Sequence, residues 1–225
     1  MGHRVLKYMK IITKKEILPI ALIIITLLIG LQLYPKLPSE VPTHWNAQGQ
    51  VDDFGSKNFA VFFFPVLALA IYLLMTFIPL IDPLKKRYKE FSLQYFWIKT
   101  IIIIFMLALY LFSLFAALGS KINIVYVIVP AISLMLILLG SFMPKIKKNY
   151  FVGVRTPWTL HSEEVWNKTH KFAGKSFIAI GTISLLGLLV KDYVFFIFIP
   201  VVILGSLAPV VYSYFVFKKI GGFKK

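Results

Sequence analysis

The sequence contains no cysteine, and only nine of its 225 residues are acidic. Without cysteine, the chain can form no disulfide, no thiolate metal site and no palmitoyl anchor. Charge of either sign is also scarce, because 15% of the residues are charged whereas 59% are hydrophobic. A soluble domain of this length could not bury so much apolar side chain. The composition therefore indicates an integral membrane protein.

Six apolar runs are long enough to cross a bilayer as helices. A hydrocarbon core about 30 Å thick requires roughly 20 residues of helix. The predicted spans are residues 17–34, 59–81, 98–118, 122–143, 172–190 and 193–217. The sequence thus predicts an all-α polytopic membrane protein, with one membrane domain over residues 1–225 and its six transmembrane helices arranged as three hairpins.

Lysine and arginine are distributed unevenly between the two ends of the predicted spans. Of the 25 basic residues, twenty lie on the side that also holds both chain termini, and four lie on the other side. The positive-inside rule therefore predicts a multi-pass cell-membrane protein with cytoplasmic N- and C-termini. This orientation, together with attraction to anionic membrane lipids, accounts for the net charge of +16, so we expect no direct binding of nucleic acid.

Ionisable side chains are almost absent from the interiors of the predicted spans. Ion-coupled transporters usually place such groups near the middle of the membrane. The spans do contain Pro65, Pro130 and Pro200, where we expect kinks and carbonyls satisfied by neighbouring groups. The proline-kinked hairpins and the paired polar loops support a small-molecule or lipid transporter or channel as the first alternative function, and the missing intramembrane charges count against it.

Residues 35–58 form a polar loop that is predicted to lie outside the cytoplasm. Three prolines stiffen its start and two glycines permit tight turns, so we expect a folded cap on the helices. One histidine beside two adjacent carboxylates lacks the spacing of a defined metal site. The candidate binding residues of this outer loop are His44, Trp45, Asn46, Asp52 and Asp53.

Residues 144–175 form the second polar segment, which is predicted to be a cytoplasmic loop with an amphipathic helix. The stretch from Leu160 to Phe172 contains no helix breaker, and Thr159 is a plausible N-cap. One face of such a helix would carry Glu163, Trp166, Asn167 and His170. The favoured interpretation is an interfacial helix whose Trp158 and Trp166 lie at the lipid headgroups.

A chemical site in the same segment is the second interpretation. His161, Glu164 and His170 are weak metal-ligand candidates, and Arg155 could hold an anion. The segment lacks an activated nucleophile and the H-E-x-x-H spacing of zinc proteases. We therefore expect no catalytic residue and no cofactor, and a membrane-embedded metal-dependent enzyme is the less favoured alternative.

Both polar strings resemble known families. The outer string, LPSEVPTHWNAQGQVDDFGSK, resembles a short extracytoplasmic domain of unknown function that follows the first helix of many bacterial and archaeal membrane proteins. The inner string, GVRTPWTLHSEEVWNKTHKFAGK, resembles the signature of the SdpI family, whose named member gives immunity against the sporulation-delaying toxin.

This resemblance implies a membrane immunity protein that protects the cell from a secreted membrane-active peptide toxin. It also implies signalling, in which toxin triggers capture of a cognate cytoplasmic repressor at the membrane. The implied partners are a peptide toxin and a repressor, in addition to the membrane lipids that the basic charge indicates. The match to the inner motif extends to Arg155, Thr156, Pro157, Trp158, Glu163, Trp166 and His170.

Overall fold

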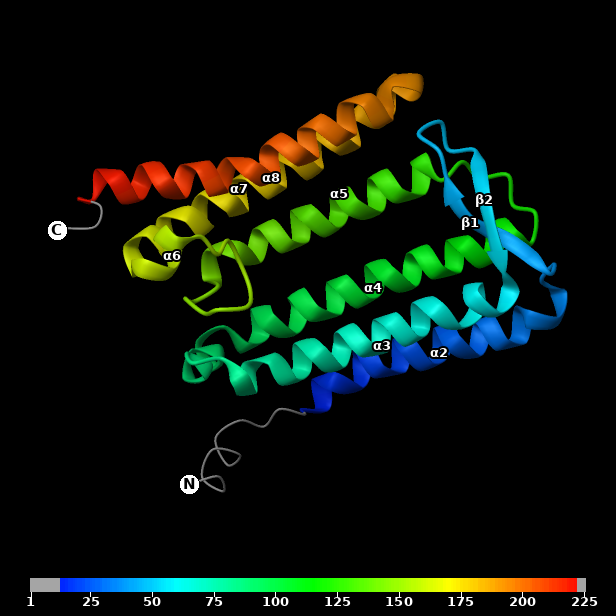
Figure 1. Cartoon of the computed structure of the whole chain (residues 1–225), viewed down its shortest axis with the longest axis horizontal. Helices are drawn as coiled ribbons and strands as arrows, with labels where there is room; N and C mark the ends of the chain where they lie inside the picture. Colours follow the sequence, from blue (N-terminus) through cyan, green and yellow to red (C-terminus); the bar gives the residue numbers. More distant parts are fainter. Residues whose placement is uncertain (1–12, 222–225) are drawn as a thin grey trace. The chain divides into compact units, whose positions relative to one another are not determined.

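A computed structural model describes residues 13–221 as a helical protein with one small β-hairpin (Figure 1). The long helices are α2 (Ile17–Leu33), α3 (Lys57–Ile81), α4 (Ser92–Ala117), α5 (Val125–Phe142), α7 (Glu163–Gly187) and α8 (Val194–Lys219). Helix α6 (Pro157–His161) is a short five-residue helix that precedes α7. Strands β1 (Glu40–Trp45) and β2 (Val51–Ser56) pair with each other between α2 and α3. Short 3-10 helices cover Lys14–Glu16, Tyr34–Lys36, Lys85–Phe91, Met143–Lys145 and Leu188–Tyr193.

Six helices in the described part of the chain are long and apolar enough to cross a membrane. This result confirms the predicted all-α polytopic membrane fold. The chain divides into two compact units. The first comprises the chain up to Leu80 together with Ile102–Ile124, and the second comprises Ile81–Ile101 together with the chain from Val125 onwards.

The first unit packs α2, α3 and the later turns of α4 around small and aromatic side chains. One cluster joins Ile23 of α2, Ala68 and Tyr72 of α3, and Ile103 and Met106 of α4. In Figure 1, α2 and α3 run side by side, and the β-hairpin lies at the end where α2 finishes and α3 begins.

A proline in α3 is accommodated by a tyrosine from α4. Pro65 has no N–H, so the carbonyl of Val61, four residues earlier, loses its partner within the helix. The hydroxyl of Tyr110 donates to that carbonyl at 3.1 Å, and Tyr110 is fully buried. Gly30 of α2 leaves the space for this hydroxyl, since a Cβ there would collide with it. This arrangement is the expected satisfaction of a carbonyl freed by proline.

The second unit packs α5 against α7 through glycines. A Cβ on Gly174 would lie 2.7 Å from the carbonyl oxygen of Gly140, and a Cβ on Gly181 would lie 2.5 Å from that of Ser133. These contacts pair residues with decreasing numbers on α5 and increasing numbers on α7, so the two helices are antiparallel. Each helix places its small residues seven apart, the spacing that keeps one stripe facing a partner.

Helix α8 completes this unit and repeats the treatment of proline seen in α3. Pro209 frees the carbonyl of Gly205, and the Ser176 hydroxyl of α7 donates to it at 2.8 Å. Val125 and Val129 of α5 pack with Val194 and Phe198 of α8.

One local feature was not predicted and one local prediction was wrong. The outer loop is a β-hairpin, which the sequence did not suggest. The predicted amphipathic helix is not separate from the fifth span, because α7 runs without interruption from Glu163 to Gly187. Its N-cap is Ser162, whose side chain accepts from the Val165 N–H, whereas Thr156 caps α6 and Thr159 lies inside that helix.

Candidate functional site

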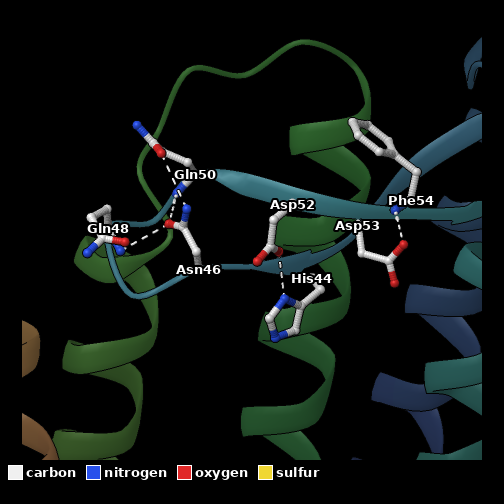
Figure 2. A network of polar contacts seen from close by, with 7 residues as sticks. All are labelled: His44, Asn46, Gln48, Gln50, Asp52, Asp53 and Phe54. Carbon is white, nitrogen blue, oxygen red and sulfur yellow. Dashed lines mark hydrogen bonds and ion pairs between the residues drawn. The ribbon is translucent and has the colours of Figure 1, made fainter.

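The β-hairpin presents most of the predicted outer-loop residues. Figure 2 shows His44 of β1 and Asp52 of β2 pointing toward each other, with Nδ1 of His44 2.6 Å from Oδ1 of Asp52. Both side chains are exposed, so this pair adds little stability and leaves its polar groups available at the surface.

Asn46 builds the turn of the hairpin. Its side-chain oxygen accepts from the N–H groups of Gln48 and Gln50, both at 3.0 Å (Figure 2). Its backbone carbonyl accepts from Gly49, which has a φ of 77°, a conformation that favours glycine. Asn46 is thus a turn-forming residue.

Three contacts hold the hairpin on the first unit. The ring of Trp45 packs at 5.7 Å from that of Phe112, and the Ser113 hydroxyl lies 3.5 Å from the carbonyl oxygen of Pro42. At the tip, the Asn123 side chain donates to the carbonyl of Gln48 at 3.0 Å. Trp45 therefore contributes to docking of the hairpin on α4, and the hairpin is the predicted folded cap.

Asn149 organises the start of the inner motif. It is fully buried, and its side-chain oxygen accepts from the N–H groups of Phe151 and Val152 at 2.9 and 2.7 Å. Its side-chain nitrogen donates to the carbonyls of Lys147 and Val152. One amide side chain thus satisfies four backbone groups of a loop that has no regular structure.

Asp82 ties the α3–α4 connection to this loop. Its carboxylate is 1% exposed and accepts from the N–H of Leu84, the N–H of Tyr150 and the hydroxyl of Tyr88. Three donors compensate the cost of burying a carboxylate. The site therefore combines two segments that are separated by about 68 residues in the sequence.

His170 and Trp166 lie beneath the loop as a stacked pair. Both are fully buried, and their rings are 4.0 Å apart at an interplanar angle of 18°. Nδ1 of His170 is 2.9 Å from the Trp166 carbonyl oxygen, which can only accept, while Nε2 accepts from the Val154 N–H at 3.1 Å. These partners require the neutral Nδ1-protonated imidazole.

Gly153 is needed beside this histidine. Its φ of 110° is rarely adopted by other residues, and a Cβ would collide with Nε2 of His170. The Trp166 indole N–H donates to the carbonyl of Ile146 at 2.8 Å, so Trp166 is a buried core residue, whereas the sequence predicted a ring in contact with lipid headgroups.

A hydroxyl cluster fixes α6 against α8. The Thr156 N–H donates to the Thr159 hydroxyl, and the Thr156 hydroxyl accepts from the Thr159 N–H, which is a capping-box arrangement. The Thr156 hydroxyl also lies 3.0 Å from that of Ser213 in α8. Trp158 packs edge-on against Tyr214, while Pro157 begins α6 and is exposed.

The charged residues of the motif lie at its surface. Arg87 from the α3–α4 connection binds Glu163 through two N–H groups, and Lys168 lies 2.6 Å from Glu164. Arg155 is exposed and donates to the carbonyl of Tyr150 at 2.9 Å. Asn167 is exposed although His170 is buried, so the four residues predicted to share one face are divided between surface and core.

The weak metal-ligand candidates are not assembled into a centre. Among the side chains that the structure describes, no group of three or more His, Cys, Asp or Glu could hold a metal ion. Both nitrogens of His170 already have partners, and Glu164 is paired with Lys168. His161 stacks edge-on with Phe217 at 5.6 Å.

Sequence reasoning missed Asp82, Tyr88 and Asn149. Asp82 is followed directly by Pro83, a pairing that signals a turn, but no local pattern indicates that its carboxylate meets a loop so far along the chain. Asn149 follows a basic run, and nothing in the local sequence indicates that its side chain organises the loop.

Comparison with known proteins finds relatives that include both the hairpin and the inner motif. "Immunity protein SdpI" of Bacillus subtilis (strain 168) is 31% identical over 210 residues, which cover 93% of this chain and 99% of that protein. The SdpI/YfhL protein family matches residues 145–213.

The chain belongs to the SdpI/YfhL protein family. A domain of unknown function (DUF1648) also matches residues 21–69, which include most of α2, the hairpin and the first half of α3. No solved structure matches this SdpI family member significantly. The resemblance predicted from the two polar strings is therefore confirmed.

Proposed function

We propose that this protein is a membrane immunity protein that protects its cell from a secreted membrane-active peptide toxin. The observation that carries the proposal is the similarity to Immunity protein SdpI, which extends over nearly the full length of both chains. It also supports a non-enzymatic role. The motif residues fit this role, because His170, Trp166 and Thr156 are used for packing and backbone hydrogen bonds.

The orientation of the chain is part of this proposal. Consecutive membrane crossings put the hairpin and the inner motif on opposite sides of the bilayer. Because the twenty basic residues lie on the side of the motif and the termini, that side is cytoplasmic. The hairpin then faces the compartment from which a secreted toxin arrives.

The inner motif is proposed to bind a cytoplasmic repressor. Hydrogen bonds to the buried side chains Asn149, Asp82 and His170 hold the loop of the motif. Arg155, Asn167 and Lys168 are exposed at the surface of the motif. A rigid frame with exposed polar groups suits protein recognition, since little conformational freedom is lost on binding.

The test is survival and membrane potential of a toxin-sensitive, immunity-deleted cell that expresses this protein. We expect protection against the sporulation-delaying toxin and none against an unrelated pore-forming peptide. No selective protection by a protein shown to be inserted and folded would contradict the proposal. Replacing Arg155 and Lys168 by Ala should leave protection unchanged and abolish membrane recruitment of a co-expressed repressor, and loss of protection would contradict the division of roles.

A further inference from the structure

The two edges of the β-hairpin are unequal. On β1, Val41 is fully buried, Pro42 has no N–H to offer, and its carbonyl faces the Ser113 hydroxyl. Such features block strand addition. On β2, every residue except Gly55 is exposed, and Phe54 is 56% exposed.

The hydrogen-bonding phase of the ladder shows which backbone groups of β2 face outward. Phe54 lies opposite Pro42, and its N–H donates to the Asp53 carboxylate at 2.8 Å (Figure 2). Three residues along, the Lys57 N–H donates across to the Ser39 carbonyl at 3.1 Å. Since partners alternate along an antiparallel ladder, Gly55 faces β1, and the N–H and C=O groups of Phe54 and the N–H of Ser56 face away from it. The Ser56 carbonyl is not part of this edge, because Ser56 caps α3, which begins at Lys57.

The hairpin carries charge opposite in sign to the net charge of the molecule, and two of its three acidic residues lie on β2. Residues 40–56 contain Glu40, Asp52 and Asp53 but no lysine or arginine, in a chain with a net charge of +16. Pairing of two β2 edges from two copies would place their aspartates against each other, which is unfavourable. The edge therefore suits a different, cationic partner.

We propose that the outer edge of β2 binds an extended, cationic segment of a peptide by strand addition, with backbone hydrogen bonds to Phe54 and Ser56 and with Asp52 and Asp53 facing its lysines or arginines. The Asp53 carboxylate closes the edge in the free protein by accepting the Phe54 N–H. When the peptide strand takes that N–H, the carboxylate is released to meet its charge. This inference rests on the proposed immunity function, because the toxin is the proposed source of the segment.

The decisive variant is Phe54→Pro. It removes an outward-facing N–H and no hydrogen bond between β1 and β2, and proline is tolerated at such an edge position. We expect binding of labelled sporulation-delaying toxin to the protein in lipid nanodiscs to weaken at least tenfold. Phe54→Ala, which keeps the N–H, should weaken binding less. Glu40→Pro makes the equivalent change at the start of the opposite edge and should have no effect.

The charge is tested by Asp53→Asn, which keeps an acceptor for the Phe54 N–H. We expect weaker toxin binding and a smaller dependence on salt concentration, whereas Glu40→Gln should change neither. Equal effects of the two substitutions would overturn the assignment of the charge to β2.

Amide hydrogen exchange on the unchanged protein gives a readout that does not depend on folding of a variant. Toxin should slow exchange at Phe54 and Ser56 and leave Gly55 unchanged. If the protein protects cells but neither amide is slowed and Phe54→Pro still binds, strand addition is wrong and immunity stands. If the unchanged protein gives no protection and binds no toxin, both proposals fail.

Discussion

Tyr110 and Ser176 play the same role as hydroxyl donors in different units of the chain. Each donates a hydroxyl hydrogen to a carbonyl that a proline has freed on another helix. In a bilayer, water cannot substitute for such a donor, so these hydroxyls are part of the helix backbone hydrogen bonding.

Tyr110→Phe should therefore destabilise the protein, because the Val61 carbonyl would be buried without a partner. We expect a loss of about 1–3 kcal/mol in the free energy of unfolding. Denaturant unfolding in detergent measures it. Tyr126→Phe removes a hydroxyl from an exposed tyrosine and should be neutral; an equal loss in both variants would contradict the assigned role.

His170 should stabilise the loop that contains Val154, because it accepts the Val154 N–H. In His170→Phe the ring can still stack on Trp166, but the Val154 N–H loses its acceptor. We expect faster trypsin cleavage after Arg155 and faster amide exchange at Val154. His161→Phe, which keeps an aromatic ring beside Phe217, should leave both rates unchanged. Unchanged cleavage in His170→Phe would show that the loop is held by Asn149 and Asp82 alone.

At the scale of elements, the α5–α7 contact depends on specific glycines. Gly181→Ala should destabilise the protein, because the new methyl group would meet the backbone carbonyl of Ser133. The colliding atom is backbone at 2.5 Å and cannot move aside easily, so overpacking should cost toward the upper end of about 1–3 kcal/mol. That cost exceeds the gain of about 1 kcal/mol in helix propensity. Thermal unfolding in detergent measures the difference.

Gly187→Ala is the matched control for this prediction. A Cβ at Gly187 has Ile197 as its nearest neighbour, at an ordinary 3.9 Å, so only the gain in helix propensity remains. The two substitutions should therefore shift the melting temperature in opposite directions. A shift of the same sign in both would argue against close packing at Gly181.

The elements also show what sequence reasoning can and cannot provide. The spans were predictable, since about 20 apolar residues are needed to cross a bilayer. The continuation of α7 through the inner motif was not, because Lys168, Lys171 and Lys175 interrupt the apolar run while Val165, Trp166, Thr169 and His170 bury one side of the helix. The hairpin was missed because Pro42 and two irregular pairings disrupt strand alternation. The partners of Asp82 and Asn149 come from distant segments, which local patterns do not reveal.

At the scale of the whole molecule, the proposed orientation predicts which surfaces are accessible from outside the cell. The lack of cysteine makes single-cysteine labelling unambiguous. With a membrane-impermeant maleimide, Gln48→Cys at the hairpin tip should react in intact cells, and Lys168→Cys in the motif should react only after permeabilisation. The reverse pattern would invert the topology and exclude the hairpin as the toxin-facing surface.

The carbonyls of Val61 and Gly205 meet their hydroxyl donors at different stages of synthesis. Tyr110 follows Val61 by 49 residues, so α3 is made before its donor exists, and ribosomes need about 2–10 s to add that many residues. Ser176 instead precedes Gly205 by 29 residues, so its hydroxyl is already present when α8 emerges. Newly made α3 must therefore remain near water or the insertion machinery until α4 arrives, whereas α8 can be completed as it enters the bilayer.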